Sequence, residues 1–444
     1  MAVLTQDEAQ AILKKVVALS QAQGCAAFLQ GSRTGNIRYA RNNVSTSGVV
    51  DDLMLAVQSN FGKKQGVATI NQLDDAALER VVRRAEELAR LAPESEEFMD
   101  LLGPQGEYGS GKGFFDATAK IDPAYRAQVA AASILPARQS QAVAAGFLVN
   151  DASFQAMMTS KGIFAYYPST NVNFTVTMRS EDGRGSGWAG VDFNDAGKLD
   201  AAAESQRALD RALRSREAKA IEPGHYTVIL EPAASVDLIA DMLFNMDARA
   251  ADEGRSFLSK KGGGSRLGEK LVDERVTLYS DPLNADVPVA GWDNEGQRLE
   301  RTAWIDKGVV KTLPTSRYWA QKQGVKPVPT PGNIIMAGGT GTTADLIKDT
   351  PRGILVTRTW YIREVDPETC LVTGLTRDGT FFIENGKVSF PIKNMRFNES
   401  AVIMFNNLEA MAAPQRVKGE VLGNVMIPPM RIRDFTFTSL SDAV

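Results

Sequence analysis

From Pro223 onward, the sequence consists mainly of short apolar runs separated by glycine, proline and asparagine residues. These runs include HYTVILEP, RVTLYSDP, GILVTRTWYI and RIRDFTFTSL, and they are rich in β-branched and aromatic residues. Runs of this length and composition predict strands joined by tight turns. One segment differs: SVDLIADMLFNMDARAADEG has helical periodicity and predicts a helix that ends at Gly254. We therefore expect residues 222–444 to form a β-rich domain with one early helix.

The sequence before this domain mixes helical and extended patterns. Residues 1–95 predict an α+β module. Its first helix begins at a Thr5–Glu8 capping box, and its strands are the runs CAAFLQ, NIRYA, LMLAVQSNF and GVATIN. A second helix follows these strands. Residues 96–113 predict a linker or long loop, because glycine and polar residues dominate there. These patterns, with the β-rich domain, place the chain in the α+β class.

Residues 114–221 predict a middle region of helices and strands. An alanine-rich helical segment is expected to be interrupted at Pro136, and extended runs such as NVNFTVTMRS follow it. The helix that closes the region, AAAESQRALDRALRSREA, has two candidate N-caps, Asp200 and Asn194. The N-terminal α/β modules thus precede the β-rich C-terminal domain.

Composition narrows the possible partners and the compartment. The net charge of −3 and a pI near 5.6 provide no basic field that would attract nucleic acid or anionic lipid. No uncharged apolar run approaches the roughly 20 residues that span a bilayer, and no targeting segment is visible at the start of the sequence. With only two cysteines, these features predict a soluble, cytoplasmic protein without nucleic-acid or membrane partners.

The residue inventory also limits the chemistry, because the chain contains a single histidine, His225. A zinc site with two histidine ligands is therefore impossible within this chain, and Cys25 and Cys370 are too few for a Cys₃ or Cys₄ site. Both cysteines are expected to be structural, and His225, at the start of a strand, lacks an identifiable catalytic partner. Any catalysis by the chain must use carboxylates, lysine, tyrosine, serine or a reactive group that another molecule supplies.

Three glycine-rich segments have a superficial likeness to phosphate-binding motifs. The GxGxxG pattern of Gly185, Gly187 and Gly190 follows a polar turn rather than a strand, so a glycine-rich turn is the favoured interpretation. Residues 260–270 have glutamate where a phosphate loop needs lysine, which favours a loop. Residues 337–348 favour a helix capped by a threonine over an anion site.

Two groups of acidic and amide side chains are candidate sites. Asp237, Asp241 and Asn245 share faces of the early helix, and Asp241 with Asn245 could bind a hard cation, although a solvated helix face is favoured. Asp293 and Glu295 would lie on the same face of a strand and could serve an independent hydrolase. A turn with solvated acids is the favoured alternative for this second pair.

The order of several segments resembles the TldD/PmbA (TldD/TldE) family, whose members were once called modulators of DNA gyrase and are regarded as peptidases. The matching segments occur in order: PGHYTVILEP, DLIADMLFNM, SFLSKK, RLGEK, VTLYSDP, WDNEGQRLERT, AWIDKGVV, GNIIMAGG, FIENGKVSFPIKN and RIRDFTF. The N-terminal helix DDAALERVVRRAEELA fits the same family. The resemblance therefore covers nearly the whole chain.

The resemblance also implies what this chain lacks. Metal-bearing, TldD-like members have an HExxxH motif on the early helix, which aligns here with Ala240, Asp241 and Asn245. Neither histidine is present, aspartate replaces the glutamate, and EVLGNVMIPP has no counterpart of a cysteine found in the metal-bearing members. The chain therefore resembles the metal-free PmbA/TldE type, with no catalytic or metal-binding residue of its own.

Metal-free members of the family imply a partner subunit. The expected role is the non-catalytic subunit of a heterodimeric zinc peptidase that degrades unfolded peptides or trims leader peptides, with zinc held by an HExxxH-bearing, TldD-like partner. A wall of strands suits an extended peptide, which can bind by β-augmentation. Two alternatives stay open: a self-contained peptide-binding homodimer without proteolytic activity, and an independent hydrolase that uses Asp293 and Glu295.

Overall fold

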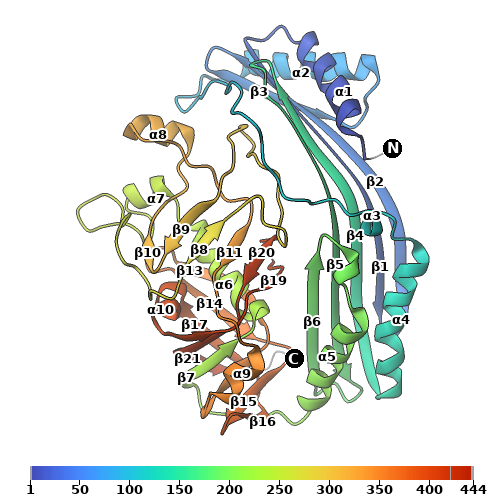
Figure 1. Cartoon of the computed structure of the whole chain (residues 1–444), viewed down its shortest axis with the longest axis vertical. Coiled ribbons are helices and arrows are strands. Elements are labelled where there is room, and N and C mark those ends of the chain that lie inside the picture. The colour runs from blue at the N-terminus through green and yellow to red at the C-terminus, as the bar shows by residue number, and fades with distance from the viewer. Residues whose placement is uncertain (1–2, 421, 442–444) are drawn as a thin grey trace.

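The computed structural model describes residues 3–420 and 422–441. The outermost residues of the predicted regions 1–95 and 222–444 therefore lie outside the described residues. In Figure 1, long strands curve along one side of the molecule, and the elements that follow residue 222 lie on the other side.

The long strands form one antiparallel sheet of six strands in the order β3-β2-β1-β4-β5-β6. Their bounds are β1 Gly24–Ala40, β2 Asn43–Phe61, β3 Lys64–Ile70, β4 Ala142–Thr159, β5 Phe164–Ser180 and β6 Ser186–Phe193. Strands of the predicted regions 1–95 and 114–221 are thus hydrogen-bonded neighbours, because β1 pairs with β4. We call this structure the long sheet.

The strands of the long sheet are longer than the sequence predicted. CAAFLQ and NIRYA were expected as separate strands, but both belong to β1, which pairs with β2 and β4 through the intervening residues. Gly35 lies in that intervening stretch, and a Cβ atom on it would come 2.3 Å from Nη1 of Arg126. The glycine therefore permits close packing instead of ending the strand.

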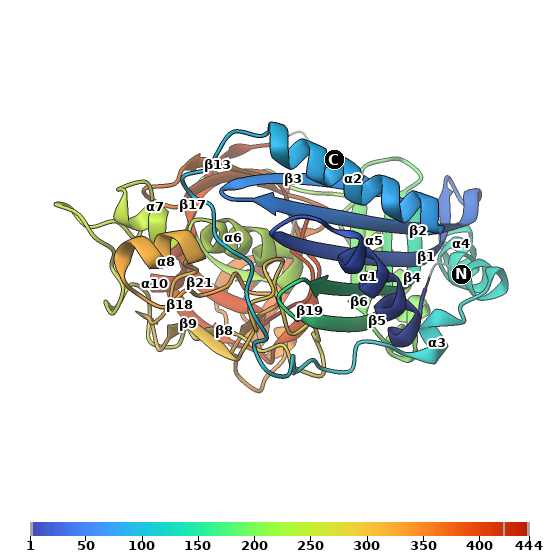
Figure 2. The same cartoon turned by 90° about the horizontal axis from the view of Figure 1, so that it is seen from above.

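Four helices cover one face of the long sheet in two pairs. Their bounds are α1 Gln6–Leu19, α2 Asp75–Leu91, α4 Pro123–Gln139 and α5 Ala201–Arg214. Figure 1 shows the two pairs near opposite ends of the strands, and Figure 2 shows the molecule from the end that carries α1 and α2. One pair buries Leu13 and Val82 against Cys25 and Leu55. The other packs Ala130 and Ala208 on the far ends of the same strands. A short helix α3 and a 3₁₀ turn η1 complete this part, at Asp116–Ala119 and Ala196–Lys198.

The caps of these helices follow the sequence closely. Thr5 and Glu8 form the predicted capping box, with the Thr5 N–H donating to Glu8 Oε2 at 2.8 Å. Asp200, one of the two candidates, caps α5 by accepting the N–H of Ala203 at 2.9 Å. The prediction that Pro136 interrupts its helix was wrong: α4 continues to Gln139, and the proline lies in its last turn, where few hydrogen bonds remain to be lost.

The rest of the chain forms a C-terminal domain with two sheets. The first has the order β10-β9-β8-β11-β20-β19, and the second has β13-β14-β17-β21-β7-β12-β15-β16 with β18 paired to β21. The strands are β7 Gly224–Leu230, β8 Leu278–Ser280, β9 Thr302–Asp306, β10 Val309–Val310, β11 Ile334–Met336, β12 Arg352–Val356, β13 Thr359–Asp366, β14 Leu371–Thr376, β15 Thr380–Glu384, β16 Lys387–Pro391, β17 Met395–Ser400, β18 Leu408–Met411, β19 Gln415–Val417, β20 Val425–Ile427 and β21 Met430–Leu440.

The expected early helix of this domain lies between the two sheets. It is α6, Pro232–Phe244, and its side chains Leu238, Ile239 and Met242 share one core with Met336 and Ile432 of the two sheets. Further helices are α7 Ala248–Asp252, α8 Arg317–Gln323, α9 Thr343–Lys348 and α10 Ala401–Asn406. The α+β prediction, with a β-rich C-terminal domain, is confirmed.

The predicted helix ending at Gly254 is in fact two helices. The α6 helix stops at Phe244, and α7 begins after Asp247, whose carboxylate accepts the N–H of Ala250 at 2.8 Å. Asparagine and aspartate side chains compete with helical hydrogen bonds and favour such breaks. No helix within residues 3–420 and 422–441 is long and apolar enough to cross a membrane.

Candidate functional site

A groove separates the uncovered face of the long sheet from the C-terminal domain. Three adjacent hollows make it up, with volumes of about 260, 330 and 280 Å³. Gln155 on β4 lines all three hollows, so we treat them as one groove. Its floor is the sheet, and its opposite wall includes the segments around Trp292 and Asn424.

Strand alternation explains why the floor of the groove is polar. In β1, Cys25, Ala27 and Leu29 point toward the helices and are buried, while Gln30 and Ser32 line the groove. Successive residues of a strand point to opposite faces, so one strand supplies a helix-covered core and a polar surface at once. The groove-lining amide and hydroxyl residues of the long sheet are Gln30, Ser32, Gln58, Ser153, Gln155, Tyr167, Ser169, Thr170 and Asn171, and Asn194 follows directly after β6.

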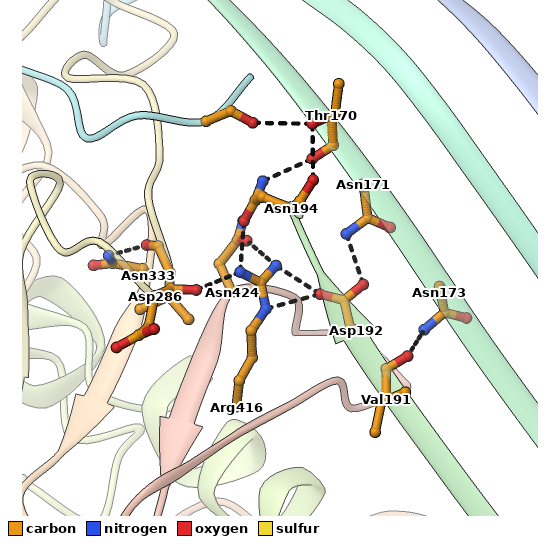
Figure 3. Close-up of polar contacts among 12 residues, drawn as sticks. Thr170, Asn171, Asn173, Val191, Asp192, Asn194, Asp286, Asn333, Arg416 and Asn424 are labelled. Carbon is orange, nitrogen blue, oxygen red and sulfur yellow. Dashed lines mark hydrogen bonds and ion pairs between the residues drawn. The ribbon is translucent and has the colours of Figure 1, made fainter. Parts of the chain in front are cut away.

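A buried arginine closes one end of the groove. Arg416 on β19 pairs with Asp192 on β6 at 2.7 Å, and their side chains are only 5% and 4% exposed. Its guanidinium also donates to Asn194 Oδ1 at 2.5 Å, to Asn424 Oδ1 at 3.3 Å and to the carbonyl of Asp286. Figure 3 shows this guanidinium held between β6 and the C-terminal domain. The contacts fix the long sheet against that domain.

At this end of the groove, opposite the lining residue Asn171 of β5, strand β4 carries a carboxyl group whose ionisation burial opposes. Asp151 on β4 has its pKa raised to about 6, chiefly by burial and also by the charge of Asp192. A hydrogen bond from Ser153 and the charge of Lys418 act in the opposite direction. Tyr167, which lines the same end, is 6% exposed and its hydroxyl has no hydrogen-bond partner in the described structure.

Asp293 lies on the opposite wall and Glu295 follows two residues later, but the two do not form a catalytic pair. Asp293 accepts the backbone N–H groups of Glu295 at 2.9 Å and Gln297 at 2.8 Å, so its carboxylate stabilises its own turn. Burial raises the pKa of Glu295, and its carboxylate lies 4.0 Å from Arg317. Residues 294 and 295 form a turn, which agrees with the favoured interpretation of the sequence and not with a strand that carries both acids on one face.

The positions of the degenerate metal motif lie on α6, inside the C-terminal domain. Ala240 is fully buried in the core. Asn245 donates its amide to Glu364 Oε2 at 2.7 Å and to the carbonyl of Asp241 at 3.0 Å. Burial, followed by the nearby charge of Glu364, raises the pKa of Asp241 to about 6, and its buried Oδ2 has no hydrogen-bond partner in the described residues.

These residues do not fit a zinc ion. Ala240 offers no donor atom, and the amide group of Asn245 is neutral and already hydrogen-bonded. Protein zinc sites use cysteine, histidine and carboxylate ligands, usually three or four together. Within residues 3–420 and 422–441, no three His, Cys, Asp or Glu side chains gather closely enough to hold a metal. We therefore derive no reaction step through a metal on this chain.

The remaining candidates from the sequence have structural positions. Cys25 and Cys370 are buried, and burial raises both thiol pKa values, that of Cys370 to about 12, so neither forms a reactive thiolate near neutral pH. His225 on β7 is exposed and contacts the Thr436 hydroxyl at 3.2 Å. Asp237 accepts the N–H of Glu420 at 2.8 Å, so it ties α6 to the segment after β19.

The glycine-rich segments are structural as well. A Cβ atom on Gly187 would come 2.2 Å from the carbonyl oxygen of Ala208, so β6 needs glycine to pack against α5. Lys260 pairs with Glu269 at 2.8 Å across the loop 260–270. Thr342 and the residue at position N3 of α9 form a capping box, which supplies hydrogen-bond partners for backbone N–H groups at the start of that helix. The favoured interpretations of all three segments agree with these contacts.

Comparisons with known proteins cover the same elements. Family models match the chain in order: the PmbA/TldA metallopeptidase domain 1 over residues 25–89, the central domain over 115–216 and the C-terminal domain over 223–439. The chain belongs to the PmbA/TldD family. The resemblance inferred from the ordered sequence segments is thus confirmed.

Curated relatives of this PmbA/TldD family member are archaeal metalloproteases. One from Methanothermobacter thermautotrophicus is 23% identical over 293 residues, which are 60% of this chain and 61% of that protein. Another, from Methanocaldococcus jannaschii, is 25% identical over 162 residues, or 34% of this chain and 35% of that protein. The matched regions thus span less than two thirds of the relatives' lengths.

Solved structures share the whole fold. TldE from Thermococcus kodakarensis has a TM-score of 0.87 at 15% identity, covering 97% of this chain and 99% of that chain. A protein named as a modulator of DNA gyrase from Bacteroides thetaiotaomicron has a TM-score of 0.84 at 21% identity, covering 98% of this chain and 100% of that chain. At these identities, the likeness establishes the fold alone.

Sequence reasoning missed the groove and the Arg416 contact. The signal for the groove is present in β5, where polar and apolar residues alternate over residues 171–179, and more briefly in β4, over residues 151–156. Such a pattern predicts a polar face opposite the helix-covered one. Nothing local marks Arg416, because its partner Asp192 lies 224 residues away in the sequence.

We predict that replacing Arg416 destabilises the protein far more than replacing an exposed arginine. Arg416→Met leaves Asp192 buried without its cation, which costs about 3–5 kcal/mol. The matched control is Arg33→Met, which breaks an Arg33–Asp51 pair whose side chains are 60% and 49% exposed and should cost less than about 1 kcal/mol. Urea unfolding of both variants measures the difference, and equal losses of stability would contradict the role of Arg416.

We also predict that Asp241→Asn stabilises the protein in a pH-dependent manner. The folded-state pKa of Asp241 is raised to about 6 from 3.8, so the folded protein favours the protonated carboxyl group. The free energy of unfolding therefore falls as pH rises through about 6 and Asp241 ionises. The variant should therefore gain about 1–2 kcal/mol over the parent at pH 8 and little at pH 4. Thermal unfolding at both pH values, with the exposed Asp210→Asn as control, tests this; a pH-independent gain would count against it.

Proposed function

We propose that this chain is the non-catalytic subunit of a TldD/TldE-like heterodimeric zinc peptidase, which degrades unfolded peptides or trims leader peptides. In this proposal an HExxxH-bearing subunit supplies zinc and the hydrolytic chemistry. The present chain contributes a surface that holds the peptide in an extended form. Both subunits act together in the cytoplasm.

The observation that carries the proposal is the combination of a metallopeptidase fold with an α6 that lacks metal ligands. The family models span the three parts of the chain, yet the motif positions carry Ala240, Asp241 and Asn245. The helix keeps its place in the core without these ligands, since eight of its residues are buried. A chain that keeps the metallopeptidase fold but lacks the metal ligands suits the role of a subunit that acts together with a catalytically active relative.

The groove supports binding of a peptide with little sequence preference. The side-chain amides of Gln30, Gln58 and Gln155 each carry donors and an acceptor. They can therefore match both the N–H and the C=O groups of an extended peptide backbone without reading its side chains. The edge strand β2, which borders the same groove, also offers backbone groups for β-augmentation.

The alternative is a self-contained homodimer that binds peptides and cleaves nothing. The same groove favours it, because peptide binding needs no metal. The independent hydrolase is not supported, since the Asp293 carboxylate is occupied with its own turn.

The first test is purification of the tagged chain from its native cells, followed by mass spectrometry of proteins that co-purify near one to one. We expect an HExxxH-bearing relative, and we expect the pure chain alone to contain far less than one zinc per chain and to leave casein uncleaved. Adding the relative should restore cleavage that a chelator abolishes. Metal-dependent cleavage by the pure chain would refute the proposal, and recovery of the chain alone would favour the homodimer.

The second test fills the groove. Gln155→Trp places a large side chain where all three hollows meet, so it should weaken binding of fluorescein-labelled, unfolded casein at least tenfold by fluorescence anisotropy. The matched control, Gln323→Trp, changes an exposed glutamine at the end of α8 and should leave binding unchanged. Both variants should unfold at the same urea concentration as the parent. Equal affinity of all three proteins would show that the peptide binds elsewhere.

A further inference from the structure

A second pocket, with a volume of about 270 Å³, lies between the end of the long sheet and the C-terminal domain. Arg184, Ser186 and Arg216 line it from the part of the chain before residue 222, and Asp378 and Lys393 line it from the C-terminal domain. Among the described residues, it shares no lining residue with the three hollows of the groove. We call it the seam pocket.

Hydrogen bonds hold the two walls of the seam pocket together. The backbone N–H of Lys219, in the segment after α5, donates to the carbonyl of Pro391 at 2.9 Å, and the N–H of Lys393 donates to the carbonyl of Lys219 at 2.9 Å. On the other wall, the Ser215 hydroxyl accepts the N–H of Ser186 at 3.0 Å and donates to its carbonyl at 2.9 Å. The pocket is therefore preformed in the folded chain.

Asp378 is the one acidic residue in the described lining of the seam pocket, and its charge is already compensated. Its side chain is 2% exposed, pairs with Arg358 at 2.8 Å and lies 3.8 Å from Arg377. Its second carboxylate oxygen accepts the Ser186 hydroxyl. The carboxylate is thus occupied by groups around the pocket, and two arginines balance its single charge.

The cationic side chains of the seam pocket are not balanced in this way. Arg184 pairs with Asp182 at 2.9 Å. Arg216 and Lys393 have no carboxylate within 4.0 Å among residues 3–420 and 422–441. Two positive charges, one from each wall, therefore remain without a counter-charge around the pocket.

The position of Arg216 makes this imbalance unfavourable. Its side chain packs across β6, where a Cβ atom on Gly185 would come 3.1 Å from its Cγ. The side chain is half-buried, and its Nε is shielded from solvent without a hydrogen-bond partner in the described structure. A partly buried charge without a partner is costly, and arginine prefers the oxygens of phosphate and carboxylate groups.

We propose that the seam pocket binds a small anion with two or more negative charges, either a phosphate compound or a polycarboxylate. The hydroxyl groups of the pocket are engaged, since Ser186 donates to Asp378, Ser215 to the Ser186 carbonyl and Thr380 to Asn394 at 3.2 Å. The cations therefore select the ligand. A ligand with several charges can contact Arg216 and Lys393 together, whereas a single carboxylate offers too little charge for both.

The bound anion would link the two halves of the protein, because Arg216 and Lys393 lie on opposite sides of the seam. Such a ligand binds the folded chain and not the unfolded one, so it stabilises the folded state. The site is separate from the groove in which we propose that a peptide binds. Loss of anion binding and loss of peptide binding can therefore be told apart.

The first experiment is isothermal titration calorimetry of the purified chain with pyrophosphate, citrate and acetate at constant ionic strength. We expect pyrophosphate or citrate to saturate near one site per chain, and acetate to bind at least tenfold more weakly. Saturation by only one of the two supports the site and assigns it to phosphates or to polycarboxylates. Binding of neither, or equally tight binding of acetate, would overturn the proposal.

The second experiment replaces the two unbalanced cations singly. Arg216→Gln and Lys393→Gln should each weaken binding of the saturating anion at least about tenfold, because each removes a charge-assisted hydrogen bond. The matched control, Lys326→Gln, changes an exposed lysine after α8 and should leave the affinity unchanged. The anion should also raise the thermal unfolding temperature of the parent chain and of the control more than that of either variant.

Folding of the variants is checked by urea unfolding without the anion. Lys393 is exposed, so Lys393→Gln should unfold at the same urea concentration as the parent and tests the site even where Arg216→Gln is less stable. Unchanged affinity in Lys393→Gln, or an equal loss of affinity in Lys326→Gln, would show that the anion does not bind in the seam pocket. Labelled casein should bind Lys393→Gln as tightly as the parent, since the groove is a separate site.

Discussion

The buried pair of Arg416 and Asp192 joins the two halves of this protein. Removing both charges from water is unfavourable, and further hydrogen bonds of the guanidinium offset this desolvation free energy. The guanidinium donates to Asn194, to Asn424 and to the carbonyl of Asp286. The pair sets the position of the long sheet against the C-terminal domain. The groove depends on that position, since one wall belongs to each half.

Other contacts across the same seam support this arrangement. Arg211 on α5 makes two hydrogen bonds of 2.7 Å to Glu231, just before α6. Ser186 on β6 donates to the buried Asp378, which also pairs with Arg358 at 2.8 Å. Because these contacts come from β6 and α5, the end of the long sheet is held firmly while the β2 edge, at the opposite side of the sheet, remains open.

The fold of this PmbA/TldD family member persists without metal ligands for a physical reason. Helix α6 packs between two sheets, and its apolar side chains supply the core of the C-terminal domain. The residues at the degenerate motif positions are compatible with the packing of the core, since Ala240 is buried within it and Asp241 and Asn245 lie at its margin. Most elements were predictable from local patterns, but their lengths and breaks were not. Strand β1 continues through Gly35 because this stretch pairs with both β2 and β4, and α6 ends early because Asp247 caps a new helix.

The sequence by itself determined which chemistry this chain lacks, because an inventory with one histidine excludes a two-histidine zinc site in any fold. It also determined the order of elements and, through that order, the family. Only the tertiary structure decided where the groove lies. Gln30, Gln155 and Asn424 are far apart in the sequence, and the strand pairing and the Arg416 contact that bring them together are long-range interactions, which no local pattern of residues specifies.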